Sequence, residues 1–242
     1  MDDLLVGRRL ADSVGMARAM ILAGEVLVDG QKVDKCGARV DGEARLRLLA
    51  RASPFVSRAG IKLEHALNHF RVEVSGKICL DVGASTGGFT DCLLQHGAAK
   101  VYAVDAGTNQ LDWKIRRDAR VVTLEKTNAR YLSPALLGNK FGLATMDVSF
   151  ISATMIVPVL PGLLETPAEV LVLVKPQFEV RRGQVEPGGM VSDQRLHEWA
   201  VNKVSRKLEE LGFAGLASVE SALAGTQGNR EYFLHAVWTK RD

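Results

Sequence analysis

The sequence predicts an α/β protein in which a mainly parallel, seven-stranded sheet is preceded by a small α+β unit. From residue 77 onward short apolar strands alternate with helical stretches, and the last two strands follow each other without a helix between them. Alternation is typical of right-handed βαβ units, whereas a strand pair that lacks a crossover helix is antiparallel. A separate helix and hairpin within the first fifty residues predict the small unit.

The composition permits these two parts but does not identify a function. The chain has 242 residues, of which 47% are apolar, enough for one large domain and a small one. Its net charge of +3 is compatible with nucleic-acid binding without requiring it. Cys36, Cys79 and Cys92 lie far apart in sequence, which favours reduced thiols over disulfides or a zinc site. We therefore expect no bound metal.

The sequence contains no export signal and no segment that suits a bilayer. Asp2 and Asp3 place acid where an export signal carries basic residues. The most apolar tract, residues 155–164, is interrupted by Pro158 and Pro161 and is too short to cross a membrane. We therefore expect a cytoplasmic protein that does not associate with membranes, and nothing in the sequence indicates an obligate protein partner.

The N-terminal unit begins with a helix and continues with a hairpin. Ser13 is placed to cap a helix that runs to residue 23, and Gly24 is placed to end it. Residues 25–28 and 31–33 read as strands, and the Asp29-Gly30 pair between them is a strong signal for a tight turn.

The stretch Gly24-Glu25-Val26-Leu27-Val28-Asp29-Gly30 resembles the hairpin motif of the S4 RNA-binding domain. The resemblance implies phosphate contacts from the basic residues of this segment, for which the candidates are Arg8, Arg9, Arg18, Lys32 and Lys35. Where that family often has Ser-Arg at the start of the helix, this chain has Ser13-Val14, so Arg18 is the candidate for the missing contact. Such contacts make RNA affinity sensitive to salt and add little sequence specificity.

A short linker with a domain boundary near residue 52 is expected at residues 50–54, because Pro54 removes a backbone donor and favours an extended chain before it. We assign residues 1–50 to the small domain, 51–56 to a linker and 57–242 to the large domain. The large domain is expected to begin with a helix at 57–70, because Leu63, Ala66, Leu67 and Phe70 form one apolar stripe. Strands are expected at 78–82, 101–104, 121–124, 143–146 and 170–174, then a helix at 193–211 and strands at 214–220 and 232–238.

A glycine-rich loop follows the first strand of the predicted large sheet. Ligands of open α/β sheets bind at the carboxyl ends of the strands, so this loop is a candidate cofactor site. The candidates are Asp81, Gly83, Ser85, Thr86, Gly87, Gly88 and Phe89, with Asp105 after the second strand to accept ribose hydroxyls and Asn128 after the third to meet an adenine edge. The loop lacks the Gly-x-Gly-x-x-Gly spacing of dinucleotide sites and the Gly-Lys-Ser/Thr ending of phosphate loops, which disfavours NAD and ATP.

Four ionisable residues stand where this topology can gather them: Lys62, Asp147, Lys175 and Glu231. With the strings around them, such as Asp147-Val148-Ser149-Phe150 and Lys175-Pro176-Gln177-Phe178-Glu179, the chain resembles the TlyA, or hemolysin-A-like, family of ribosomal RNA 2′-O-methyltransferases over nearly its whole length. The resemblance implies an S4 domain, a Rossmann-like class I methyltransferase domain of FtsJ type, S-adenosylmethionine as cofactor, and these four residues as a catalytic tetrad. It also implies ribosomal RNA or ribosomal subunits as partner, with a cytidine as target.

The chemistry that the resemblance implies is attack of a ribose 2′-oxygen on the sulfonium methyl group, with Lys175 assisting removal of the proton. The sequence leaves the protonation state of Lys175 open, because Lys62 favours the neutral amine and the two carboxylates favour the ammonium. It also leaves three different functions open: a non-catalytic ribosome assembly factor, a pore-forming hemolysin, and a nicotinamide oxidoreductase. An amino-group methyltransferase is disfavoured because Asp147-Val148-Ser149-Phe150 lacks the two prolines of its motif. The loop between Gly183 and Gly189 is either a lid or a plain surface loop.

Overall fold

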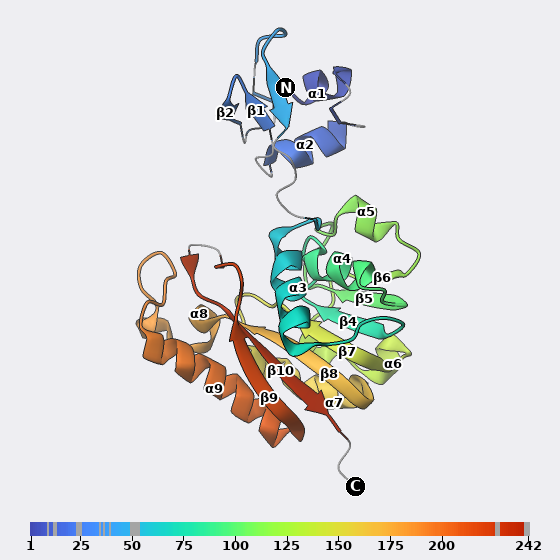
Figure 1. Cartoon of the computed structure of the whole chain (residues 1–242), viewed down its shortest axis with the longest axis vertical. Coiled ribbons are helices and arrows are strands. Elements are labelled where there is room, and N and C mark those ends of the chain that lie inside the picture. Colours follow the sequence, from blue (N-terminus) through green and yellow to red (C-terminus); the bar gives the residue numbers. More distant parts are fainter. Residues whose placement is uncertain are drawn as a thin grey trace. The chain divides into compact units, whose positions relative to one another are not determined.

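The structure is a computed structural model that describes residues 1–8, 10–11, 14–22, 26–33, 35, 37–38, 40–48, 54–225 and 228–239. The chain divides into two compact units, Met1–Pro54 and Phe55–Asp242 (Figure 1). Ser13, Gly24 and residues 51–53 of the expected linker lie outside the described residues.

In the described part of the small unit, two helices accompany a three-stranded antiparallel sheet. Its elements are α1 (Asp2–Gly7), α2 (Val14–Leu22), β1 (Val26–Val28), β2 (Gln31–Lys32) and β3 (Leu46–Leu48), with strand order β2-β1-β3. The predicted hairpin is confirmed: φ is positive at both Asp29 and Gly30 (49° and 85°), as a type I′ turn requires. Buried Leu5, Ile21 and Val26 form its core. The sequence prediction did not include α1 and β3.

The large unit is built on a seven-stranded sheet of order β6-β5-β4-β7-β8-β10-β9. The strands are β4 (Ile78–Val82), β5 (Lys100–Val104), β6 (Val121–Leu124), β7 (Phe141–Met146), β8 (Leu164–Val174), β9 (Phe213–Glu220) and β10 (Tyr232–Trp238). The pairs among β4 to β8 are parallel, and β10 is antiparallel to both β8 and β9. The predicted fold class, with its antiparallel last strand, is therefore confirmed.

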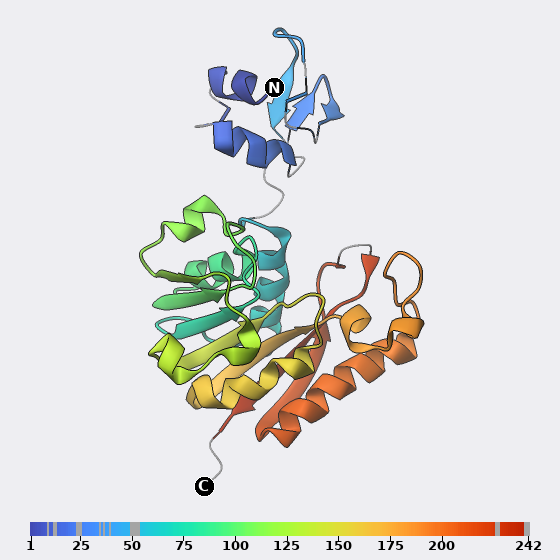
Figure 2. The same ribbon diagram turned by 180° about the vertical axis from the view of Figure 1, so that it is seen from behind.

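Helices cover both faces of this sheet (Figures 1 and 2). The helices are α3 (Arg58–Phe70), α4 (Gly88–Gln95), α5 (Trp113–Arg116), α6 (Pro134–Leu137), α7 (Leu160–Leu163), α8 (Pro176–Glu179) and α9 (Gln194–Glu210), with 3₁₀ turns η1 (Ala129–Tyr131), η2 (Ala153–Met155), η3 (Val157–Val159) and η4 (Arg182–Gln184). α3 and α4 pack on one face, and α9 packs on the other.

The alternation of side chains along β8 shows why two cores form. Leu171 and Leu173 are buried with α3 and α4, whereas Val170, Val172 and Val174 are buried with α9. Successive residues of a strand point to opposite faces, so a strand that is covered on both sides is apolar throughout. Burying one such side chain contributes about 1.5–3 kcal/mol, and the sheet is thereby a rigid base for the loops at its carboxyl edge. Among the described residues, no helix combines the length and the apolar character that a membrane span needs.

Candidate active site

The loop between β4 and α4 approaches the end of β7 closely at Gly83. Gly83 has φ of 87°, and a Cβ atom there would lie 2.2 Å from the carbonyl oxygen of Asp147. Only glycine therefore fits, both for its conformation and for the space available. The consequence is a backbone junction between the glycine loop and the segment that carries Asp147.

This junction lies in a cleft of about 500 Å³ at the carboxyl edge of the sheet. Five of the residues expected from the sequence line the cleft: Gly83, Ser85, Asp105, Asn128 and Asp147. Sequence reasoning did not select the other lining residues, which are Val104, Ala106, Gln110, Thr127, Ala129, Arg130, Val148, Ser149, Phe150, Ile151 and Ile156. Of these, Thr127 and Ala129 flank Asn128, and Val148 to Ile151 follow Asp147 directly. Their places beside predicted residues could have indicated them from the sequence.

Asp105 is held in place by two backbone donors, one in the glycine loop and one two residues further along its own loop. Its Oδ2 accepts from the N–H of Ser85 at 2.8 Å, and its Oδ1 accepts from the N–H of Gly107 at 2.7 Å. Each carboxylate oxygen retains a further lone pair, so the carboxylate can still accept from ligand hydroxyls. Asn128 is fixed differently, because its Oδ1 accepts from the N–H of Arg130 at 3.1 Å and caps η1.

Asp81 does not line the cleft. Its carboxyl is completely buried and accepts from the hydroxyls of Thr90 at 2.6 Å and Thr145 at 3.2 Å. Burial raises the pKa of Asp81 to about 7, against the opposing effect of these two hydrogen bonds. The side chain thus ties α4 and β7 to β4 instead of facing a ligand directly.

Thr86, Gly87, Gly88 and Phe89 are also absent from the cleft lining. At Gly88 a Cβ atom would lie 2.2 Å from the hydroxyl oxygen of Ser57, so this glycine lets α4 start against the beginning of α3. Phe89 is buried, and its ring stacks on Phe233 with centroids 5.8 Å apart. This second half of the loop therefore packs α4 against α3 and against the sheet.

The four tetrad candidates form two ion pairs. Nζ of Lys175 lies 2.5 Å from Oδ1 of Asp147, and Nζ of Lys62 lies 2.6 Å from Oε2 of Glu231. Lys175 also donates to the hydroxyl of Ser149 at 3.0 Å. All four side chains are at most 17% exposed, which makes each charge dependent on its partner.

The topology explains why both ion pairs form at this edge of the sheet. Asp147 follows β7 and Lys175 follows β8, and the carboxyl ends of these neighbouring parallel strands share one edge of the sheet. Glu231 precedes β10, whose first residue Tyr232 pairs with Val174, so the antiparallel register brings Glu231 to the same edge. Lys62 reaches it from α3. Near Gly225 the space is tight, because a Cβ there would lie 2.0 Å from Oε1 of Glu231.

The loop between Gly183 and Gly189 is tied to the segment before Glu231. Asn229 is buried, and its Nδ2 donates to the carbonyl of Gly189 at 2.8 Å while its Oδ1 accepts from the N–H of Val191 at 2.9 Å. Within the loop, the N–H of Glu186 donates to the carbonyl of Met190 at 2.8 Å. The loop is therefore held by a backbone hydrogen bond of its own and by the amide side chain of Asn229.

The basic candidates of the small unit differ in what their side chains contact. Arg8 donates to the carbonyls of Ala44, at 2.7 Å, and Gly42, and Arg18 forms an ion pair with Asp2 at 2.6 Å. Lys32 and Lys35 are exposed, and Arg9 lies outside the described residues. Arg8 and Arg18 thus help to hold the small unit together, whatever else they bind. No group of His, Cys, Asp or Glu able to hold a metal occurs in the part of the chain that the structure describes.

Comparison with known proteins places this geometry in a family. The profile of FtsJ-like methyltransferases matches residues 55–238, and the profile of the S4 domain matches residues 2–46. The chain is 45% identical to TlyA of Mycobacterium tuberculosis, a 16S/23S rRNA (cytidine-2′-O)-methyltransferase, over 97% of this chain and 88% of that protein. It is 40% identical to Hemolysin A of Brachyspira hyodysenteriae, over 98% of this chain and 99% of that protein.

A solved structure from Streptococcus thermophilus, described as a candidate hemolysin, is also similar. It is 40% identical, has a TM-score of 0.78, and the match covers 99% of this chain and 88% of that one. Full-length identity of this size, together with the two matched profiles, establishes the relationship. The chain belongs to the TlyA, or hemolysin A-like, family, in which an S4 domain precedes an FtsJ-like methyltransferase domain.

Proposed function

We propose that this protein transfers a methyl group from S-adenosylmethionine to the ribose 2′-hydroxyl of a cytidine in ribosomal RNA. The observation that carries the proposal is the pair of buried Lys–carboxylate contacts, Lys175–Asp147 and Lys62–Glu231, at the edge of the sheet where the glycine loop opens a cleft. The relative from Mycobacterium tuberculosis, which is named for this reaction, supports the choice of ribose and of cytidine.

The residues of the cleft fit this cofactor. Gly83 leaves its backbone bare beside Asp147, which lets a ligand approach the main chain closely. Asp105 offers carboxylate oxygens for ribose hydroxyls, and Asn128 lies beside it for an adenine edge. Bound there, S-adenosylmethionine supplies an electrophilic methyl group on a sulfonium. Asp81, which the sequence analysis includes among the cofactor-site candidates, is buried and supports the glycine loop without contacting the cofactor in this proposal.

Lys175 is our candidate for receiving the proton of the 2′-hydroxyl group, a role that requires its neutral amine form, because an ammonium has no lone pair to accept a proton. Its Nζ atom is oriented by Asp147 and by Ser149, both of which line the cleft. Lys62 and Glu231 hold each other and, in our proposal, orient the ribose and Lys175. Placing two reactants in line supplies roughly 7–11 kcal/mol of barrier reduction in favourable cases, whereas proton transfer supplies about 10²–10⁴-fold in rate. Placement is therefore the larger contribution.

Phe150 offers a surface for the base of the target nucleotide. Its side chain is 91% exposed, lines the cleft three residues after Asp147, and has a positive φ of 64°. A large exposed ring on a strained backbone has no evident role in folding. Proteins that act on single nucleotides commonly stack the unpaired base on an aromatic ring, and Phe150 suits that use.

We assign RNA capture to residues 1–50, a linker to 51–56 and catalysis to 57–242. Exposed Lys32 and Lys35, with Arg9, are the first candidates for phosphate contacts, and Arg8 and Arg18 combine that role with their internal contacts. The partner is ribosomal RNA or a ribosomal subunit, and the place of action is the cytoplasm, where that substrate is found.

The proposal is tested by incubating the purified protein and labelled S-adenosylmethionine with ribosomes that lack the modification. Digestion of the RNA to nucleosides should give labelled 2′-O-methylcytidine. A parallel titration should show that S-adenosylmethionine, and not NAD, raises the melting temperature. Label on a base, or stabilisation by NAD alone, would contradict the proposal, and binding to ribosomes without any transfer would favour an assembly factor.

A further inference from the structure

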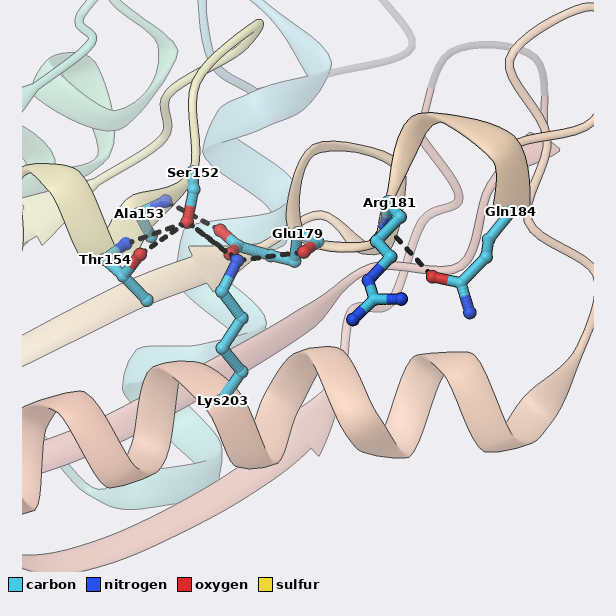
Figure 3. Close-up of polar contacts among 7 residues, drawn as sticks. All are labelled: Ser152, Ala153, Thr154, Glu179, Arg181, Gln184 and Lys203. Carbon is cyan, nitrogen blue, oxygen red and sulfur yellow. Dashed lines mark hydrogen bonds and ion pairs between the residues drawn. The ribbon is translucent and has the colours of Figure 1, made fainter.

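A buried polar cluster lies outside the cleft and joins the two segments that carry Asp147 and Lys175 (Figure 3). Its centre is Glu179, the last residue of α8, whose side chain is 2% exposed. Neither Glu179 nor its cationic partner Lys203 lines the cleft. A buried carboxylate is costly unless it is paired, so its presence here calls for a role.

Glu179 binds three partners on two elements. Its Oε1 accepts from the backbone N–H of Ala153 at 2.6 Å, and its Oε2 accepts from the hydroxyl of Ser152 and from Nζ of Lys203, the latter at 2.9 Å. Lys203, on α9, also donates to the carbonyl of Glu179 at 2.8 Å and to Ser152 at 3.2 Å, and its ammonium lies 5.5 Å from the ring centre of Trp199. Figure 3 shows Lys203 extending from α9 to the point where Ser152 and Glu179 meet.

The positions of these residues along the chain make the cluster relevant to the site. Ser152 is five residues after Asp147, and Glu179 is four residues after Lys175. The two segments therefore contact each other at the Asp147–Lys175 ion pair and again, further along both segments, at Glu179. Between these contacts the rings of Phe150 and Phe178 lie 5.3 Å apart. The two segments are thus in contact at both ends, and Lys203 attaches the end at Glu179 to α9.

The same cluster accounts for the backbone of Phe150. A positive φ at a bulky residue costs of order 1–3 kcal/mol and persists only where the surroundings enforce it. Phe150 is nearly fully exposed, so its own side chain contributes little burial. The chain is held on both sides of Phe150, at Asp147 by the ion pair with Lys175 and at Ser152 by the hydrogen bond to Glu179. These two contacts enforce the backbone conformation between them.

We propose that Glu179, neutralised by Lys203, is a positioning residue for methyl transfer that sets the distance between the Asp147 and Lys175 segments. This inference rests on the proposed function. Lys203→Met leaves a buried carboxylate without its cation, and we expect the two segments to shift apart. The rate constant for methyl transfer at saturating substrates should fall by about 10²-fold, the scale of a 1 Å misplacement. The dissociation constant of S-adenosylmethionine should change much less than the rate constant, because neither Glu179 nor Lys203 lines the cleft.

The double variant Glu179→Gln/Lys203→Met supplies the decisive comparison. The neutral amide retains an oxygen for the N–H of Ala153 and no longer needs a cation, so activity should recover at least about tenfold over Lys203→Met. Lys203→Arg, which keeps the charge, should stay near wild type. Lys77→Met is the matched control, because it breaks the Lys77–Glu169 ion pair in the same domain. It should lower the melting temperature without changing the rate constant.

The proposal is overturned if Lys203→Met lowers the melting temperature as Lys77→Met does while the folded protein transfers methyl groups at the wild-type rate. If Lys203→Met does not fold, Ser152→Ala takes its place, since it removes one donor to Glu179, and an unchanged rate constant in that variant overturns the proposal equally. A wild-type protein that transfers no methyl group overturns the proposed function itself, and the catalytic role of Glu179 with it. The two failures are thus distinguished by the wild-type measurement.

Discussion

At the scale of single residues, Gly83 shows how one position serves both folding and ligand binding. Gly83→Ala forces a side chain into left-handed backbone and against the Asp147 carbonyl. We expect a loss of stability of about 3 kcal/mol or more, with weaker S-adenosylmethionine binding. The matched control is Gly76→Ala, which has φ of 74° but nothing within 4 Å of its Cβ, and should cost only about 1–2 kcal/mol. Urea unfolding measures the stability of both variants, and calorimetric titration measures their affinity for S-adenosylmethionine. An equal loss of stability in the two variants would contradict the close approach of Gly83 to the Asp147 carbonyl.

Asp81 gives a residue-scale prediction about pH. Its pKa is raised from 3.8 to about 7 by burial, so the unfolded chain releases this proton at lower pH than the folded chain does. Wild type therefore loses stability as pH rises from about 4 to 7, whereas Asp81→Asn does not titrate. Relative to wild type, the free energy of unfolding of the variant should rise between pH 5 and pH 8 by up to about 2.6 kcal/mol, because the folded carboxyl titrates about two pH units above the start of that range.

Urea unfolding at the two pH values measures this gain. Asp118→Asn is the control, because the Arg120 guanidinium beside Asp118 holds the pKa of that carboxyl below its usual value and keeps it ionised at both pH values. Its difference from wild type should not change between pH 5 and pH 8. A constant difference for Asp81→Asn as well would show that this carboxyl titrates normally.

At the scale of elements, the segment before β10 depends on the loop before α9. Asn229→Ala removes the partners of the Gly189 carbonyl and the Val191 N–H, and an unsatisfied buried group costs about 1–3 kcal/mol. Because Glu231 follows two residues later, methyl transfer should fall as well. Asn139→Ala is the control, since Asn139 bonds Tyr102 through its amide outside the described active site. Asn139→Ala should leave the rate of methyl transfer unchanged. Equal rates in the two variants would contradict a connection between Asn229 and the position of Glu231.

The elements that sequence could predict are those with strong periodicity. The helix at 57–70, the strands of the large sheet and the helix at 193–211 were expected because apolar residues recur at the spacing of the element. Residues 153–163 have no such pattern: two prolines divide an apolar tract into the short turns η2, η3 and α7. In the small unit, α1 and β3 were missed because six and three residues are too few for a pattern to appear.

The site was predictable to the extent that topology places residues at strand ends. Asp147 and Lys175 were expected together because the carboxyl ends of neighbouring parallel strands share an edge, and Glu231 was expected there because it begins the antiparallel last strand. The burial of Asp81 could not be predicted, because its partners Thr90 and Thr145 lie on other elements and belong to no motif. Glu179 was missed for the same reason: Ser152 and Lys203 are distant in sequence, and only the fold joins them.

At the scale of the whole molecule, the two units divide RNA capture from chemistry in our proposal. Removing residues 1–50 should weaken binding to ribosomal RNA by about tenfold or more at moderate salt and reduce its salt dependence, because basic phosphate contacts are lost. Binding of S-adenosylmethionine should be unchanged, since the cleft is built from residues 83–156. Filter binding at several salt concentrations and calorimetry measure the two affinities. Equal loss of both in a folded truncated protein would contradict the division.

The central claim is that Lys175 and its partners direct a methyl group to a ribose oxygen. The measurement that tests it most directly is single-turnover transfer of labelled methyl to ribosomes that lack the modification, by wild type and by Lys175→Ala, with the label located after digestion. We predict label on the 2′-oxygen of cytidine with wild type, and its loss in Lys175→Ala while S-adenosylmethionine still binds. Label on a base, or full transfer by the variant, would contradict the account.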